Sequence, residues 1–265
     1  MHFSFRHAVA LIALALAACA SKAPTNTPPA QPEQAPVKAQ EATLPQRAQQ
    51  HADLAAGYYE RGQFDVALQE LAEAQRLDPS NARVYNVYGL VYTMMGDNKK
   101  AEESFRQALS LAPNDSEIHH NWGVFLCATG RAREAIPEFD QAIRNPLYKT
   151  PETALINAGK CSVTLGDLAK ANTYFRQAMA VSPNNPVAAY NLALLAYREN
   201  RLDEARGWMR PVMQQQTPPP EALYLGMCIE RKQGDRQSEL SYTTQLRNRY
   251  PDSAEAKALS GGSCE

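Results

Sequence analysis

Residues 82–115 read ARVYNVYGLVYTMMGDNKKAEESFRQALSLAPND, and residues 116–149 read SEIHHNWGVFLCATGRAREAIPEFDQAIRNPLYK. The two stretches are equally long, and small or aromatic residues recur at the same places in both. The matching residues are Gly89 and Gly123, Gly96 and Gly130, Ala101 and Ala135, Phe105 and Phe139, and Ala108 and Ala142. Agreement of these positions at one fixed spacing predicts a chain built from a repeated unit.

The repeat extends over most of the chain. Its clearest marker is a glycine in the middle of the unit, found at Gly62, Gly96, Gly130, Gly166 and Gly234. An alanine follows five residues later at Ala67, Ala101, Ala135, Ala171 and Ala205. The spacing of 34 residues between the first three glycines is typical of tetratricopeptide repeats, in which each unit is a pair of antiparallel helices. We count six units, which begin near residues 48, 82, 116, 152, 186 and 220.

Each part of the pattern has a physical reason. The mid-unit glycine ends the first helix because the chain must reverse within a few residues, and an aspartate such as Asp97 after it can cap the second helix. Small residues such as Gly89 let the two helices approach, and the aromatic residue fills the gap between units. One helix pair cannot bury its apolar face alone, so neighbouring units must stack. The predicted fold is an all-α tetratricopeptide-repeat superhelix with a concave groove over residues 47–254, followed by a C-terminal tail over residues 255–265.

The last two units depart from the pattern. Asn200 replaces the turn glycine of the fifth unit, and asparagine tolerates a left-handed backbone. Met209 stands where other units carry phenylalanine, and Glu239 occupies the small-residue position of the sixth unit. A degenerate last unit is consistent with a terminal repeat that faces water on one side.

The N-terminus has the composition of a secretion signal. An apolar run from Ala8 to Ala17 follows Arg6, and it is too short to span a bilayer as a helix. The sequence Leu16-Ala17-Ala18-Cys19 resembles the bacterial lipobox, in which the cysteine is acylated and becomes the first residue after cleavage. The alternative is an ordinary cleaved signal whose cysteine is incidental. We interpret residues 1–18 as a lipoprotein signal peptide and Cys19 as the site of lipidation.

A proline-rich segment without hydrophobic periodicity follows and continues to residue 46. Such a segment has little to bury, so residues 19–46 are predicted to be the lipidated cysteine and a disordered tether. Ala20 follows the cysteine, and by resemblance to lipoprotein sorting rules an alanine there indicates the outer membrane of a Gram-negative cell.

Four further cysteines remain in a compartment where disulfides persist. Cys127 and Cys161 fall late in the first helices of units three and four, which should lie side by side, so we expect a disulfide between them. Cys228 and Cys264 could pin the C-terminal tail onto the sixth unit, with less certainty. Buried free thiols are the alternative for both pairs.

A partner segment would bind in the groove lined by the first helix of each unit. The predicted groove residues in units one to three combine apolar with polar side chains, and we expect them to favour an apolar or amphipathic peptide. They are Tyr59, Arg83, Asn86, Leu90, Thr93, Met94, Glu117, His120 and Val124. Units four and five continue the groove with Ile156, Lys160, Tyr190, Leu194 and Tyr197. For each aromatic residue among them, packing between helices is the alternative to a role in binding.

Other classes of function have little support in the sequence. Lys plus Arg number 27 and Asp plus Glu number 28, so no field of one sign attracts nucleic acid. His119 and His120 lie about 100° apart around a helix and cannot share one metal ion. The chain has no His-Glu-x-x-His motif, phosphate-binding glycine loop or Gly-x-Ser-x-Gly turn. We therefore expect no catalysis, cofactor, metal or small-molecule substrate.

A more specific pattern lies in the middle of the chain: NWGVFLC at residues 121–127, Gly130-Arg131, NPLYKTP at residues 145–151, and NAGKC at residues 157–161. Together with six repeats and a lipobox, these stretches resemble the type IV pilus biogenesis and stability lipoprotein family, PilF or PilW. The resemblance implies a pilotin that binds the pilus secretin and promotes its outer-membrane localisation and multimerisation. The protein would then sit at the periplasmic face, held by its lipid anchor. A general periplasmic scaffold for peptidoglycan enzymes or β-barrel assembly is the alternative.

Overall fold

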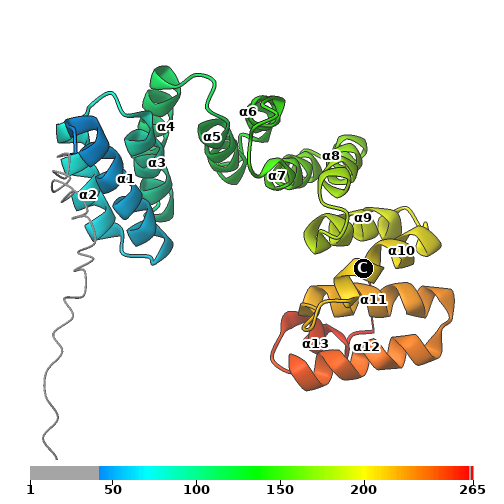
Figure 1. Ribbon diagram of the computed structural model, residues 1–265. Coiled ribbons are helices and arrows are strands. Elements are labelled where there is room, and N and C mark those ends of the chain that lie inside the picture. Colours follow the sequence, from blue (N-terminus) through cyan, green and yellow to red (C-terminus); the bar gives the residue numbers. More distant parts are fainter. Residues whose placement is uncertain (1–41, 263, 265) are drawn as a thin grey trace, which may run out of the picture. The chain divides into compact units, whose positions relative to one another are not determined.

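The computed structural model describes residues 42–262 and residue 264, and over these residues it is helical with no strand (Figure 1). The predicted signal peptide, Cys19 and most of the predicted tether lie outside the described residues. The helices are α1 (Leu44–Glu60), α2 (Phe64–Leu77), α3 (Ala82–Met94), α4 (Asn98–Leu111), α5 (Ser116–Ala128), α6 (Ala132–Arg144), α7 (Pro151–Thr164), α8 (Leu168–Val181), α9 (Pro186–Arg198), α10 (Leu202–Met213), α11 (Pro220–Gln233), α12 (Arg236–Arg249) and the short α13 (Ala254–Ala258).

Helices α1 to α12 pack as six successive pairs, as the repeat count predicted (Figure 1). Each second helix, such as α2, also packs against the first helix of the next unit. First helices of successive units contact one another, as α1 does α3 and α3 does α5. The first helices therefore form the inner, concave face, and the prediction of an all-α tetratricopeptide-repeat superhelix is confirmed.

The first helix begins earlier than the sequence indicated. α1 starts at Leu44, so residues 44–46, which were assigned to the tether, are helical. Thr43 caps it in a capping box: its hydroxyl accepts from the backbone N–H of Gln46 at 3.4 Å, and the Gln46 side chain accepts from the Thr43 N–H at 2.8 Å.

The turns inside the units follow the predicted chemistry. The mid-unit glycines have left-handed backbones, with Gly62 at φ +71° and Gly130 at φ +82°, and Asn200 adopts the same region at φ +58°. Asp97 accepts a hydrogen bond from the backbone N–H of Lys100 at 3.1 Å and so caps α4. These local signals place each helix reversal where the repeat requires it.

The interior between helices depends on a phenylalanine packed over a glycine. A Cβ atom on Gly89 would lie 2.6 Å from the Phe105 ring, and one on Gly159 would lie 2.4 Å from the Phe175 ring. The small residue in the first helix thus makes room for an aromatic ring as well as for close helix approach. Phe105 also contacts the next unit, where its ring centre lies 5.8 Å from that of Trp122. The same ring therefore links its own unit to the following one.

The sixth unit solves its packing differently. Glu239, at the place of the repeated alanine, is only 5% exposed, and it pairs with Arg231 at 2.9 Å and Arg236 at 2.7 Å. A glutamate here was consistent with a terminal unit that faces water on one side, but its carboxylate is enclosed. Beyond α12, the predicted tail begins with the one-turn helix α13, which packs against α11 and α12.

Candidate peptide-binding surface

The candidate site is the inner face formed by the first helices of the first three units, α1, α3 and α5. Three of the nine predicted residues are well exposed there: Met94 at 59%, Val124 at 40%, and Glu117. Tyr59, Leu90, Thr93, Arg83 and His120 are half-buried. This part of the inner face therefore presents accessible apolar atoms beside a small number of charged ones.

Asn86 corrects the prediction, because its side chain is 2% exposed and lies between the helices rather than in the groove. Its Oδ1 accepts a hydrogen bond from the Asn121 amide of the next unit at 3.2 Å. The Thr93 hydroxyl is also internally bonded, since it donates to the Gly89 carbonyl of its own helix at 2.7 Å. Asn86 is thus part of the architecture that couples units two and three.

Arg83 connects three units by charge. Its Nε lies 2.8 Å from a carboxylate oxygen of Asp53 on α1, and its Nη1 lies 3.9 Å from one of Glu117 on α5. Asp53 and Glu117 are exposed and Arg83 is half-buried, so the pairs contribute little to stability. Their placement sets the polar border of the apolar surface instead.

The inserted loop between α6 and α7 closes over His120. The Tyr148 hydroxyl lies 2.8 Å from Nδ1 of His120, and the Asn157 amide lies 2.9 Å from Nε2. Because an amide nitrogen can only donate, Nε2 is the acceptor, and the neutral ring carries its proton on Nδ1. The loop also exposes Leu147 at 85% beside this anchored tyrosine. His120 therefore serves to hold the loop more than to offer a free group to a ligand.

The pKa values of the adjacent His119 and His120 are shifted in opposite directions. The Glu138 carboxylate, 2.6 Å from Nδ1 of His119, raises the pKa of that imidazole, and the Pro113 carbonyl supports it from Nε2 at 2.9 Å. Burial lowers the pKa of His120. As expected from their angular separation, the two side chains serve separate contacts, with Glu138 and with Tyr148.

The predicted continuation of the groove is only partly open. Ile156 and Tyr197 are buried at 7% and 8%, Lys160 is exposed, and Tyr190 and Leu194 are half-buried. A cleft of about 540 Å³ lies here between α9, α11 and α13. Its lining includes Tyr190, Leu194, Tyr197, Tyr224 and Cys264.

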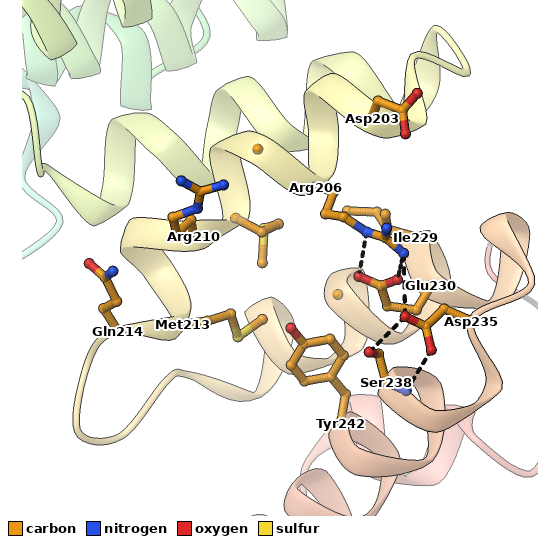
Figure 2. A pocket seen from close by; sticks show the side chains of 13 residues that line it. Asp203, Arg206, Arg210, Met213, Gln214, Ile229, Glu230, Asp235, Ser238 and Tyr242 are labelled. Atoms are coloured by element: carbon orange, nitrogen blue, oxygen red, sulfur yellow. Dashed lines mark hydrogen bonds and ion pairs between the residues drawn. The ribbon is translucent and has the colours of Figure 1, made fainter.

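A second cleft, of about 560 Å³, lies between α10, α11 and α12 (Figure 2). In it, Arg206 binds both carboxylate oxygens of Glu230, one of them from Nε at 3.0 Å, and lies 3.7 Å from Asp235. Met213 and Tyr242 complete the wall above Gly226. The network joins Arg206 on α10 to Glu230 on α11 and so links units five and six.

Comparison with known proteins agrees with this architecture. Models of the tetratricopeptide repeat match residues 53–116 and 126–186, residues 163–225, and residues 222–253. The crystal structure of PilW, a widely conserved type IV pilus biogenesis factor, is 31% identical in sequence, with a TM-score of 0.71 over 80% of this chain and 97% of PilW. The chain belongs to the PilF/PilW family.

Another member gives the same result. The type IV pilus assembly protein PilF of Pseudomonas aeruginosa is 29% identical over 77% of this chain and 81% of its own length. A structure of Pseudomonas aeruginosa PilF, 27% identical, has a TM-score of 0.77 over 83% of this chain and 99% of that one. The expectation of a type IV pilus repeat protein, made from the inserted loop and its flanking residues, is confirmed.

The cysteines of this PilF/PilW family member are placed in pairs. Cys127 on α5 is paired with Cys161 on α7 with Cα atoms 5.9 Å apart, and Cys228 on α11 with Cys264 at 5.6 Å. Both separations lie in the range that a disulfide spans. The first pair joins units three and four on either side of the inserted loop.

Two general properties complete the site. Among residues 42–262 and 264, no group of three histidine, cysteine or acidic side chains is arranged to hold a metal ion. Within the same part of the chain, every helix is too short or too polar to cross a membrane.

Sequence reasoning missed two features of this family member. It did not find the second cleft, although Glu239 in an alanine position signalled a changed interior in unit six. It also did not anticipate that Tyr148 would reach back to His120, because a loop's path is not encoded by periodicity.

Proposed function

We propose that this PilF/PilW-family protein is a pilotin, a lipoprotein that binds a type IV pilus secretin and promotes its insertion and multimerisation in the outer membrane. The supporting observation is the accessible apolar surface of Met94, Val124 and Leu90 on α3 and α5, bordered by Arg83 and Glu117. An amphipathic peptide segment of the secretin would place apolar side chains on this surface and polar ones on its border.

The anchor completes the proposal. Cys19, acylated after removal of residues 1–18, would hold the protein at the periplasmic face of the outer membrane, because each buried CH₂ of the acyl chains contributes about 0.8 kcal/mol. A secretin protomer bound to the anchored protein would be carried to the membrane and concentrated there, which favours ring assembly. The protein would act by binding alone, without catalysis or cofactor.

We further propose that both cysteine pairs are disulfides in the cell. A bond between Cys127 and Cys161 would fasten α5 to α7 and keep the inner face of units three and four in one geometry. Non-reducing peptide mapping of the purified protein tests this, and two alkylatable thiols per pair would contradict it.

The decisive experiment is deletion of the gene, followed by fractionation of the secretin. We expect monomers away from the outer membrane and few heat-resistant multimers; normal multimers in the outer membrane would refute the pilotin role. Complementation with Cys19→Ala tests the anchor separately. That variant should fold normally, leave the membrane fraction and fail to restore multimers in the outer membrane.

A further inference from the structure

The inner face of units five and six is covered, whereas that of units two and three is open. Val124 on α5 is 40% exposed, but Cys228, three units later at the equivalent place on α11, is 2% exposed. Tyr197 on α9 is likewise 8% exposed. The segment that covers them is the chain's own C-terminus, formed by Leu259–Gly262 and Cys264, which we name the C-terminal strap.

The strap is held through its backbone. The Tyr197 hydroxyl donates to the carbonyl of Cys264 at 3.1 Å, and Nη1 of Arg231 donates to the carbonyl of Gly262 at 3.0 Å. The two donors belong to different helices, α9 and α11, so the contact spans two repeat units. Leu259 packs against the apolar cluster of the last two units, and Cys228 is paired with Cys264.

The two donor side chains, Arg231 and Tyr197, are also held by contacts outside the strap. Glu239 accepts from Nε of Arg231 at 2.9 Å, which leaves Nη1 to point at the Gly262 carbonyl. Lys232 lies over the Tyr197 ring at 4.3 Å and packs against its face. Side chains fixed by such contacts lose little freedom when they bind.

Most of the strap is composed of small residues that allow backbone contacts with the helices. Ser260, Gly261 and Gly262 carry small side chains or none, so their backbone can approach the helices closely. The carbonyl groups of Gly262 and Cys264 accept hydrogen bonds from side chains, and the Leu259 side chain adds an apolar contact. Residues 259–261 form a turn and Gly262 is left-handed at φ +68°, so the site recognises the backbone of a tight turn.

We propose that units five and six carry a binding site for the backbone of a small-residue peptide turn, and that the C-terminal strap is its resident occupant. This site is separate from the surface of units one to three to which the secretin is assigned. An outside segment of the same kind binds in units five and six only when the strap is displaced. The strap therefore confines partner binding to the earlier units.

A disulfide-exchange experiment tests the proposal on the full chain. The Cys264→Ser variant leaves Cys228 as a thiol, and the probe is the peptide AEAKALSGGSCE, the sequence of residues 254–265, supplied as its mixed disulfide with glutathione. The Cys228 thiolate attacks the peptide sulfur, a new disulfide joins the two, and glutathione leaves as its thiolate. No oxidant is consumed. The control peptide has the same composition with the cysteine at the same place and the other residues scrambled.

Coupling is followed by intact mass, and the labelled residue is identified by peptide mapping. We expect the native peptide to couple to Cys228 about tenfold faster than the scrambled one, the factor that two hydrogen bonds of ordinary net strength give. Adding Tyr197→Phe to the variant should reduce that preference by about fivefold. Equal coupling rates of the two peptides would overturn the proposal.

A second measurement keeps both native cysteines. In the single variant Tyr197→Phe, hydrogen exchange of residues 259–262 should be about fivefold faster than in the wild-type chain, because one hydrogen bond to the strap is lost. Exchange in α3 and α5 should not change. Unchanged exchange in the strap would show that the Tyr197 contact does not hold it.

Discussion

Substitution of Gly159 by alanine gives the sharpest test of how the units are packed. Alanine normally stabilises a helix interior by about 1 kcal/mol relative to glycine. Here the added Cβ would lie 2.4 Å from Cε1 of Phe175, whereas carbon atoms in contact are about 3.5–4.0 Å apart. Phe175 is fully buried in the core that spans units two to five. Overpacking of about 1–3 kcal/mol should therefore outweigh the helix preference.

Because the 2.4 Å approach is more than 1 Å inside van der Waals contact, the upper part of the overpacking range applies, about 2–3 kcal/mol. Subtracting about 1 kcal/mol for the helix preference leaves an expected fall in the free energy of unfolding of about 1–2 kcal/mol for Gly159→Ala. Gly57→Ala is the matched control, because its Cβ would meet only Nη2 of Arg61 at 3.7 Å; it should stabilise the protein by about 0.5–1 kcal/mol. Urea unfolding followed by far-UV circular dichroism measures both. If Gly159→Ala were as stable as the wild type, the proposed packing of ring over glycine would be refuted.

A double-mutant cycle identifies the partner in that clash. Phe175→Leu removes the ring atoms nearest to Gly159, so the combined variant should lose less than the sum of the two single losses. A coupling energy of about 0.5–3 kcal/mol is expected for residues in contact. Additive losses would mean that the alanine strains some other neighbour.

Two further predictions concern titration and the cysteines. An unfolded histidine titrates at about pH 6.5. The raised pKa of His119 contributes stability that is fully present below the unfolded pKa and is lost as pH rises through the folded pKa. The lowered pKa of His120 costs stability as pH falls below the unfolded pKa. From pH 7.5 to 5.5, His119→Gln should therefore lose stability more steeply than the wild type, and His120→Gln less steeply; parallel urea-unfolding curves for all three would contradict these settings. Replacing Cys127 and Cys161 by alanine should cost about 3–4 kcal/mol by the chain-entropy estimate for a separation of 34 residues, and no shift of the urea midpoint relative to the oxidised wild type would mean that the bond is absent or does not constrain the chain.

Much of the fold could be predicted because the same turn and core residues recur in successive units. Gly96, Gly130 and Asn200 mark turns whose left-handed backbones the structure confirms. Phe105 and Gly89 recur at a fixed spacing, which predicted a packing role for each, but their direct contact within one unit is seen only in the structure. The start of α1 was placed too late, since Pro45 was taken as part of the tether rather than as an early helical residue.

The candidate surface was less predictable because side-chain exposure depends on neighbouring units. Asn86 was expected in the groove, but its side chain is buried between helices, where the Asn121 amide donates to it. Tyr197 was assigned to the open groove, and the C-terminal strap covers it. Both corrections come from contacts between residues about 35 to 67 positions apart, which a repeat pattern does not describe.

Direct binding of a secretin to the inner face tests the central proposal most closely. The measurement is the Kd between the purified mature protein and the periplasmic part of its secretin, for the wild type, for the variant Met94→Asp with Val124→Asp, and for Gln107→Asp on the exposed side of α4 as the control. All three proteins should unfold at similar urea concentrations, because the changed residues are exposed. We predict that the double variant weakens binding at least tenfold while Gln107→Asp leaves it unchanged, about 1.4 kcal/mol being lost per factor of ten. Equal binding by all three would contradict the account.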